Sequence, residues 1–116
     1  MSSKQTIYLG EIAIGTCSLT RCDPSMGVAH SLVEPAVESA LWGQFLLDHG
    51  AEFEDGIVAL GHRSELHIKD EKGEKIGALF CFLQYVQELN ETWVEACGIH
   101  WQEFEERFPE SDARIR

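Results

Sequence analysis

The chain has 116 residues, of which 44% are hydrophobic, and its 20 acidic and 9 basic side chains give a net charge of -11. This length and composition predict one globular domain over residues 1–116 and exclude a disordered acidic tail. The negative charge disfavours direct binding of nucleic acid or of an anionic membrane, and it favours encounter with a basic protein or nucleoprotein complex.

The first half of the chain predicts a strand, a loop and a helix. Alternating apolar residues from Ile7 to Ile14 indicate a strand, and a phase slip at Gly10 indicates a bulge or tight bend. Residues 16–30 are rich in Gly, Ser, Thr, Asp and Pro, as is typical of a loop. A helix is expected to begin at Ser31 or Pro35 and to end before the glycine at position 50. Its buried stripe would be Val33, Val37, Leu41 and Phe45.

The second half predicts a buried strand at 57–60, then a hairpin in which residues 66–68 and Ile76 flank a turn at 70–73. From residue 78 the apolar period changes to about 3.6, which predicts a helix. The residues that define this helical face are Leu79, Phe82, Leu83, Val86 and Leu89. Asn90 or Thr92 would cap a further helix, which Gly98 would break or bend.

Helical spacing resumes at Trp101, Phe104 and Phe108, with Glu103 and Arg107 four residues apart and able to pair. Pro109 ends this element. The order of strand, helix, strands and helices predicts an α+β fold, in which a small antiparallel sheet carries two to three helices on one face.

Membrane and targeting signals are missing from the sequence. No run approaches the ~20 apolar residues of a membrane span, and no apolar signal segment follows the first residues. A cytoplasmic protein is therefore expected, and its four cysteines are expected to be reduced.

Motifs for metal, nucleotide or nucleophilic chemistry are incomplete. The histidines and cysteines show none of the paired spacings of a zinc site, and the glycines form no phosphate-binding pattern. We therefore expect no metal, no cofactor and no catalytic residues. The strongest exception is Cys97 with His100, which would share a helical face if the chain is helical there.

The acidic side chains are unevenly distributed and give the main functional prediction. One group is Glu52, Glu54 and Asp55, and the other is Glu88, Glu91, Glu95, Glu103 and Glu106. On a helix, the residues at 88, 91 and 95 would lie on one side, although like charges at this spacing destabilise an isolated helix. We therefore predict that these eight carboxylates bind a basic partner, with Tyr85, Trp93 and Trp101 nearby as possible anchors.

The resulting hypothesis is a non-catalytic inhibitor of a basic, nucleic-acid-handling protein, because carboxylates can steer association and stand in for phosphates. An immunity protein against a nuclease toxin and a phage-encoded inhibitor of a host defence complex both need this surface. Two alternatives remain open. One is a small ligand-binding or enzymatic domain that uses Cys97 and His100, and the other is an accessory subunit that pairs through the hairpin edge at 66–76. The sequence leaves a homodimer open.

Overall fold

The structure is a computed structural model that describes residues 4–61 and 65–109. This part of the chain contains nine strands, two α-helices and one 3-10 turn. The strands are β1 (Gln5–Leu9), β2 (Ile12–Cys17), β3 (Thr20–Asp23), β4 (Val28–Pro35), β5 (Glu52–Glu54), β6 (Ile57–Leu60), β7 (Leu66–Lys69), β8 (Phe80–Val86) and β9 (Glu91–Cys97). The helices are α1 (Ser39–Asp48) and α2 (Trp101–Arg107), and η1 (Pro24–Met26) lies between β3 and β4.

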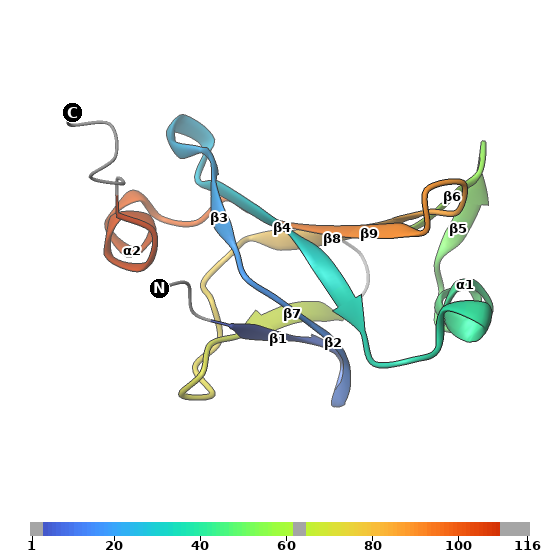
Figure 1. The fold of residues 1–116 in the computed structure, drawn as a ribbon. Helices are drawn as coiled ribbons and strands as arrows, with labels where there is room; N and C mark the ends of the chain where they lie inside the picture. The colour runs from blue at the N-terminus through green and yellow to red at the C-terminus, as the bar shows by residue number, and fades with distance from the viewer. Residues whose placement is uncertain (1–3, 62–64, 110–116) are drawn as a thin grey trace.

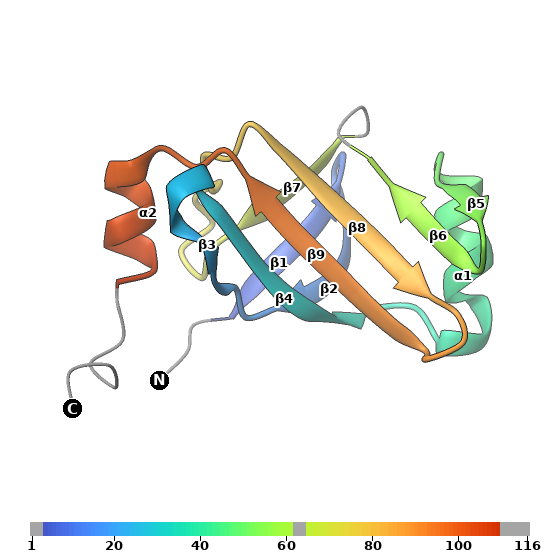
Figure 2. The ribbon, with the colours of Figure 1, turned by 90° about the horizontal axis from the view of Figure 1, so that it is seen from above.

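The strands form one continuous antiparallel sheet that folds over into two layers (Figure 1). The strand order is β5-β6-β8-β9-β4-β2-β1-β7, and β3 also pairs with β4. In Figure 2 the larger layer, with β8, β9 and β4, lies over the smaller layer of β1, β2 and β7. The two helices lie at opposite ends of the molecule (Figures 1 and 2). The predicted antiparallel sheet and the presence of helices are therefore confirmed, but the fold is predominantly β and its helices do not share one face of a small sheet.

The hydrophobic core lies between the two layers. Alternate residues of each strand point inward, as strand geometry requires. Fully buried apolar side chains come from both layers and from both helices, and the largest are Trp42, Phe104, Ile7, Ile14, Leu46, Leu60, Ile68 and Leu83. On α1 the buried pair is Trp42 and Leu46, one turn apart.

Strand β4 belongs to both layers. Its first half, from Ala29 to Leu32, pairs with β9 in the larger layer. Its last three residues, from Val33 to Pro35, pair with β2 in the smaller layer. The two strands before β4 also run from one layer to the other. Strand β2 pairs with the end of β4, and β3 pairs with the beginning of β4. The two layers are therefore joined by one long, bent hairpin.

Two buried polar side chains stabilise the bend between β2 and β3. The side-chain oxygen of Gln5, which is 4% exposed, accepts a hydrogen bond of 2.8 Å from the backbone N–H of Leu19. Ser31 Oγ accepts a 2.9 Å bond from the N–H of Ser18. A buried N–H without a partner costs free energy comparable to a lost hydrogen bond, so these two side chains allow the chain to leave one layer for the other.

Several predicted elements of the first half are corrected by the structure. The slip at Gly10 is a tight turn between β1 and β2, and this glycine has a φ of 63°. Residues 28–35 form a strand, although they were expected to be loop and helix, so Val33 is buried in β4. Leu41, predicted to be buried, is 58% exposed because α1 begins later and presents a different side. The predicted stop at Gly50 is confirmed by its φ of 100°.

The second half contains one large error and several confirmed elements. The predicted helices from 78 to 97 are wrong, since β8 and β9 form an antiparallel hairpin that runs from Phe80↔Cys97 to Val86↔Glu91. The strand at 57–60, the strand at 66–69 and the helix at 101–107 are confirmed. The backbone returns from the turn at 70–73 as predicted, with Ile76 donating its N–H to Ile68 O at 2.9 Å.

The bend between β2 and β3 gives a test of the fold. Replacing Gln5→Leu removes the acceptor for Leu19 N–H while it keeps most of the buried volume, so we expect a loss of about 1–3 kcal/mol in the free energy of unfolding. The matched control is Gln44→Leu on the exposed side of α1, where we expect a change within about 0.5 kcal/mol. Urea denaturation measures both. Equal effects of the two substitutions would show that Gln5 does not stabilise the bend.

Candidate partner-binding face

The larger layer presents one face to the core and one away from it. Burial alternates along β8 and β9, where Cys81, Leu83 and Val94 are buried and their neighbours are more exposed. We call the surface formed by the outward residues of β4, β9, β8, β6 and β5 the outer face. Its residues are Val28, His30, Leu32, Cys97, Glu95, Trp93, Glu91, Phe80, Phe82, Gln84, Val86, Ile57, Ala59, Glu52 and Glu54. Neither described helix lies over it (Figures 1 and 2).

One side of the outer face, formed by β4 and β9, is apolar and aromatic. Leu32 is directly opposite Trp93 in the register, and it is 50% exposed. The Trp93 ring lies 5.5 Å from the ring of His30, and its Nε1 donates to Glu91 Oε1 at 3.4 Å. Strands that are apolar on both sides are usually covered on both sides. The composition of β8, with Phe80, Phe82 and Val86 on its outer side, therefore indicates a surface suited to being covered by a partner.

The charge of the outer face has a single sign. Its five strands contain no lysine or arginine, and His30 is their only side chain able to become cationic. Strand register places Glu54 opposite Ile57, Ile57 opposite Val86, and Val86 opposite Glu91. Four glutamates thus share this face with Leu32 and Trp93, namely Glu52, Glu54, Glu91 and Glu95. None of the four enters a salt bridge within residues 4–61 and 65–109.

The structure divides the eight predicted partner-binding carboxylates into two groups. Six lie on or beside the outer face. Four of them belong to it, namely Glu52, Glu54, Glu91 and Glu95. The other two lie in adjoining turns, Glu88 between β8 and β9 and Asp55 between β5 and β6. The predicted helical stripe of Glu88, Glu91 and Glu95 does not exist. Glu91 and Glu95 nevertheless share a side, because residues four apart on a strand point the same way.

The remaining two, Glu103 and Glu106, lie on α2 at the other end of the molecule (Figure 1). Glu103 is engaged internally, since its Oε2 accepts from Arg107 Nε at 2.7 Å and from Gly77 N at 3.0 Å. Arg107 also bonds Asp70 Oδ2 through Nη1 at 2.9 Å. This Asp70–Arg107–Glu103 cluster attaches α2 to the turn after β7, which is a structural role. Glu106 is exposed on the same helix.

The three aromatic residues predicted as anchors lie in different parts of the structure. Tyr85 is buried, with only 8% exposed, and it points into the core, so it is not available to a partner. Trp101 is 68% exposed, but it lies on α2. Trp93 alone of the three lies on the outer face. Leu32 and His30 were missed because residues 28–35 were not recognised as a strand, although they alternate and follow a turn sequence.

Cys97 and His100 do not share a helical face, because Cys97 ends β9 and His100 is the N-cap of α2. Burial, Glu95 and Cys22 raise the pKa of the Cys97 thiol above its ordinary value of 9.0, which reduces the thiolate fraction. His100 Nδ1 accepts the N–H of Gln102 at 3.2 Å at the start of α2, so that nitrogen is already engaged. Residues 4–61 and 65–109 contain no group of three or more side chains placed to bind a metal ion.

Comparison with models of protein families, with curated proteins and with solved structures finds no match for the chain. Neither helix in the described part of the chain is long and apolar enough to cross a membrane. Function is therefore inferred from the chemistry of the outer face and of the residues next to it.

The Asp70–Arg107–Glu103 cluster predicts how stability depends on pH. The hydrogen bond from Arg107 holds the pKa of Asp70 below its ordinary 3.8. Burial raises the pKa of Glu103, but the bonds from Gly77 and Arg107 outweigh it and bring that pKa below 4.5. Both carboxylates therefore stabilise the fold above their ordinary pKa values, and this contribution is lost as the pH falls through the lowered ones.

We expect Arg107→Met to destabilise the protein at pH 7 and to do so progressively less below about pH 4. The matched control is Lys4→Met, which removes only an exposed pair with Glu34 at 3.4 Å, and we expect less than about 1 kcal/mol at any pH. Thermal unfolding at a series of pH values measures both. A constant difference between wild type and Arg107→Met would contradict this assignment.

The cysteines provide a chemical test of the strand assignment. Burial raises the pKa of Cys17 to about 12 and that of Cys81 to about 11, whereas Cys22 is exposed. In the native protein at pH 8 we expect iodoacetamide to label Cys22 first and to label the two buried thiols only after unfolding. Mass spectrometry of digested samples reads the sites. Native labelling of Cys81 at the rate of Cys22 would place the inner side of β8 at the surface and contradict the fold.

Proposed function

We propose that the protein is a non-catalytic binding protein whose outer face docks on a basic surface of a nucleic-acid-handling protein and thereby inhibits it. The observation that carries the proposal is the combination on five adjacent strands of four glutamates, no lysine or arginine, and an apolar patch at Leu32 and Trp93. Carboxylates steer the encounter with a basic cleft, and the patch at Leu32 and Trp93 supplies the desolvated contact on which affinity depends.

The basic side chains of the described chain support a directed encounter. Lys69 lies on β7, and Lys72 and Lys75 lie in and after the turn that follows it. Arg21 and Arg107 are bonded to carboxylates next to α2. Among the described residues, positive charge thus lies on the smaller layer, just before β1 at Lys4, and beside α2, while the five strands of the outer face carry no lysine or arginine. Such an asymmetric distribution orients the molecule as it approaches a cationic partner.

The biological form of the inhibitor follows from the partner. An immunity protein that neutralises a nuclease toxin and a phage-encoded inhibitor of a defence complex both present carboxylates to a cleft that otherwise accepts phosphates. Identification of the captured partner distinguishes these two forms.

The accessory-subunit alternative has weaker support. Strand β7 is the last in the strand order, as pairing through the hairpin edge requires. However, the returning segment already bonds this strand, with a bridge between Lys69 and Lys75 and a bond from Ile76 N to Ile68 O. The edge that a second chain would use is therefore partly occupied by the chain itself.

Charge reversal on the outer face tests the proposal. We expect Glu52→Lys/Glu95→Lys to fold normally and to weaken partner binding by at least about tenfold at low salt, because two attractive contacts become repulsive. The control is Glu71→Lys/Glu74→Lys, which makes the same change in net charge at exposed residues beside the smaller layer. Each protein is immobilised, loaded with lysate of the source cells, eluted with a salt step, and assayed by calorimetry against the protein identified.

Capture that the control retains and the outer-face variant loses would support the proposal. Equal loss in both variants would show that only net charge matters, and equal retention would show that the partner binds elsewhere. Either result would overturn the assignment of the outer face. The affinity of the true complex should also fall as salt rises, because the contributing charges are exposed.

A further inference from the structure

A groove opens where β4 separates from β9. The last β4–β9 pair is Leu32↔Trp93, after which β4 turns toward β2. Strand β9 extends two residues beyond that pair, to Glu91, where it still pairs with β8. The space between the diverging strands is a groove of about 450 Å³, bounded also by the segment that leads into α1. It is continuous with the outer face, because Leu32 and Glu91 belong to both.

The groove has rigid apolar walls. They include Leu32, Pro35, Val37 and Trp42. Trp42 is 1% exposed, and its Nε1 donates a 2.8 Å bond to the buried Thr92 Oγ1. A wall held by a buried hydrogen bond keeps its shape without a partner, so little conformational entropy is lost when a side chain enters.

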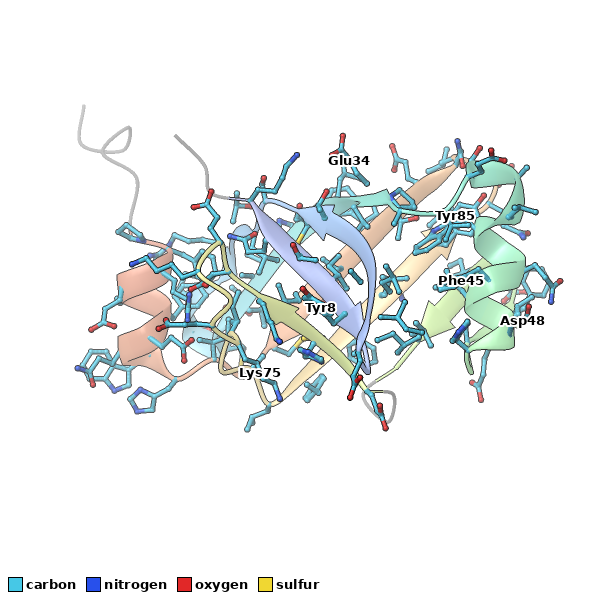
Figure 3. All side chains as sticks on the ribbon, turned by 90° about the horizontal axis from the view of Figure 1, so that it is seen from below. Tyr8, Glu34, Phe45, Asp48, Lys75 and Tyr85 are labelled. Atoms are coloured by element: carbon cyan, nitrogen blue, oxygen red, sulfur yellow. The ribbon has the colours of Figure 1, made fainter. Side chains whose placement is uncertain are left out.

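Two carboxylates lie at the groove, and no basic residue of the described ranges 4–61 and 65–109 lines it. Glu91 is half-buried, and Trp93 Nε1 bonds one of its oxygens at 3.4 Å. Glu34 extends away from the end of β4 (Figure 3), where its Oε1 accepts from Thr16 Oγ1 and pairs with Lys4 Nζ, each at 3.4 Å and exposed. Exposed pairs of this kind contribute little and exchange readily. The groove therefore combines apolar walls with negative charge that its own lining does not neutralise.

We propose that this groove receives an arginine side chain of the basic partner. The apolar walls would cover the methylene stem, and the planar guanidinium would bond Glu91 and Glu34, which line the groove from two strands. Arginine fits better than lysine because its guanidinium is less strongly hydrated and presents several donors in one plane. This inference rests on the proposed function, and it adds the side chain that the partner inserts.

The test uses a probe that contains one arginine and no other charge, the tripeptide Ac-Gly-Arg-Gly-NH2. Titration into ¹⁵N-labelled protein at low salt is followed by the indole N–H signal of Trp42 and the backbone signal of Asn90, which also lines the groove. We expect saturable shifts at both residues in the millimolar range. The lysine peptide should bind several-fold more weakly, and Ac-Gly-Gln-Gly-NH2 should leave both signals unchanged.

The decisive variant is Glu91→Gln, which keeps the shape of the side chain and removes its charge. We expect about tenfold weaker binding of the arginine peptide, the loss of one charge-assisted contact. The control is Glu71→Gln, an exposed glutamate in the turn after β7, which should bind as wild type does. Unmoved Trp42 and Asn90 signals, equal responses to the three peptides, or equal binding by Glu91→Gln and wild type would each overturn the proposal.

Failure of this inference is distinguishable from failure of the proposed function. If the arginine peptide shifts Trp93 but not Trp42, the groove is not its site while the outer face remains a binding surface. If Glu52→Lys/Glu95→Lys retains the partner, the proposed function fails whatever the peptide does.

Discussion

The sharing of β4 between two layers is the constraint on which the rest of the structure depends. A single strand of eight residues pairs with β9 and β3 at one end and with β2 at the other. The sheet must therefore fold over itself, and the apolar sides of its two parts meet as a core. The same geometry leaves the second side of the larger layer uncovered by the described helices and opens a groove where β4 and β9 diverge. The buried side chains of Gln5 and Ser31 make this bend tolerable, because they bond the backbone N–H groups that it would otherwise leave without partners.

Much of the local structure could be predicted from sequence, and the main error has a specific cause. The helix at 101–107 and the strands at 57–60 and 66–69 follow from spacing and from their bounding glycines. The segment from 80 to 86 was misread because both of its sides are apolar. Phe82, Leu83 and Val86 are all apolar, so the spacing of apolar residues fits a helical period of 3.6 as well as a strand period of two. Periodicity alone does not separate a helical stripe from a strand that is apolar on both sides.

A second signal was present and overlooked. Asp55-Gly56 lies between Glu54 and Ile57 and forms a two-residue turn in which both residues have positive φ, 53° and 78°. This dipeptide is among the strongest short-range signals of a hairpin, and it identifies β5 as the partner of the correctly predicted β6. With that hairpin recognised, Glu52 and Glu54 would have been placed on an edge strand.

The acidic character of the candidate site could be predicted from the sequence, but the residues that belong to it could be predicted only in part. The acidic groups around residues 52–55 and 88–95 are separated in sequence and become adjacent only through the pairing of β6 with β8. Glu95 and Glu103 look equivalent in the sequence. One is exposed on the outer face and the other bonds Arg107, and this difference depends on where α2 packs. Sequence patterns report the type of side chain, whereas availability to a partner depends on tertiary contacts.

The acidity of the outer face also bears on whether the protein associates with itself. An apolar patch such as that at Leu32 and Trp93 favours association with another apolar surface, including a second copy of the same chain. Two copies placed face to face would bring Glu52, Glu91 and Glu95 against identical charges, which opposes that dimer. A basic partner, in contrast, is attracted to the same glutamates. Carboxylates that served only to keep the protein from associating with itself could do so from many places on the surface. Their location on the same face as this apolar patch, on five strands without lysine or arginine, is the feature that favours the proposed cationic partner over a role in solubility alone.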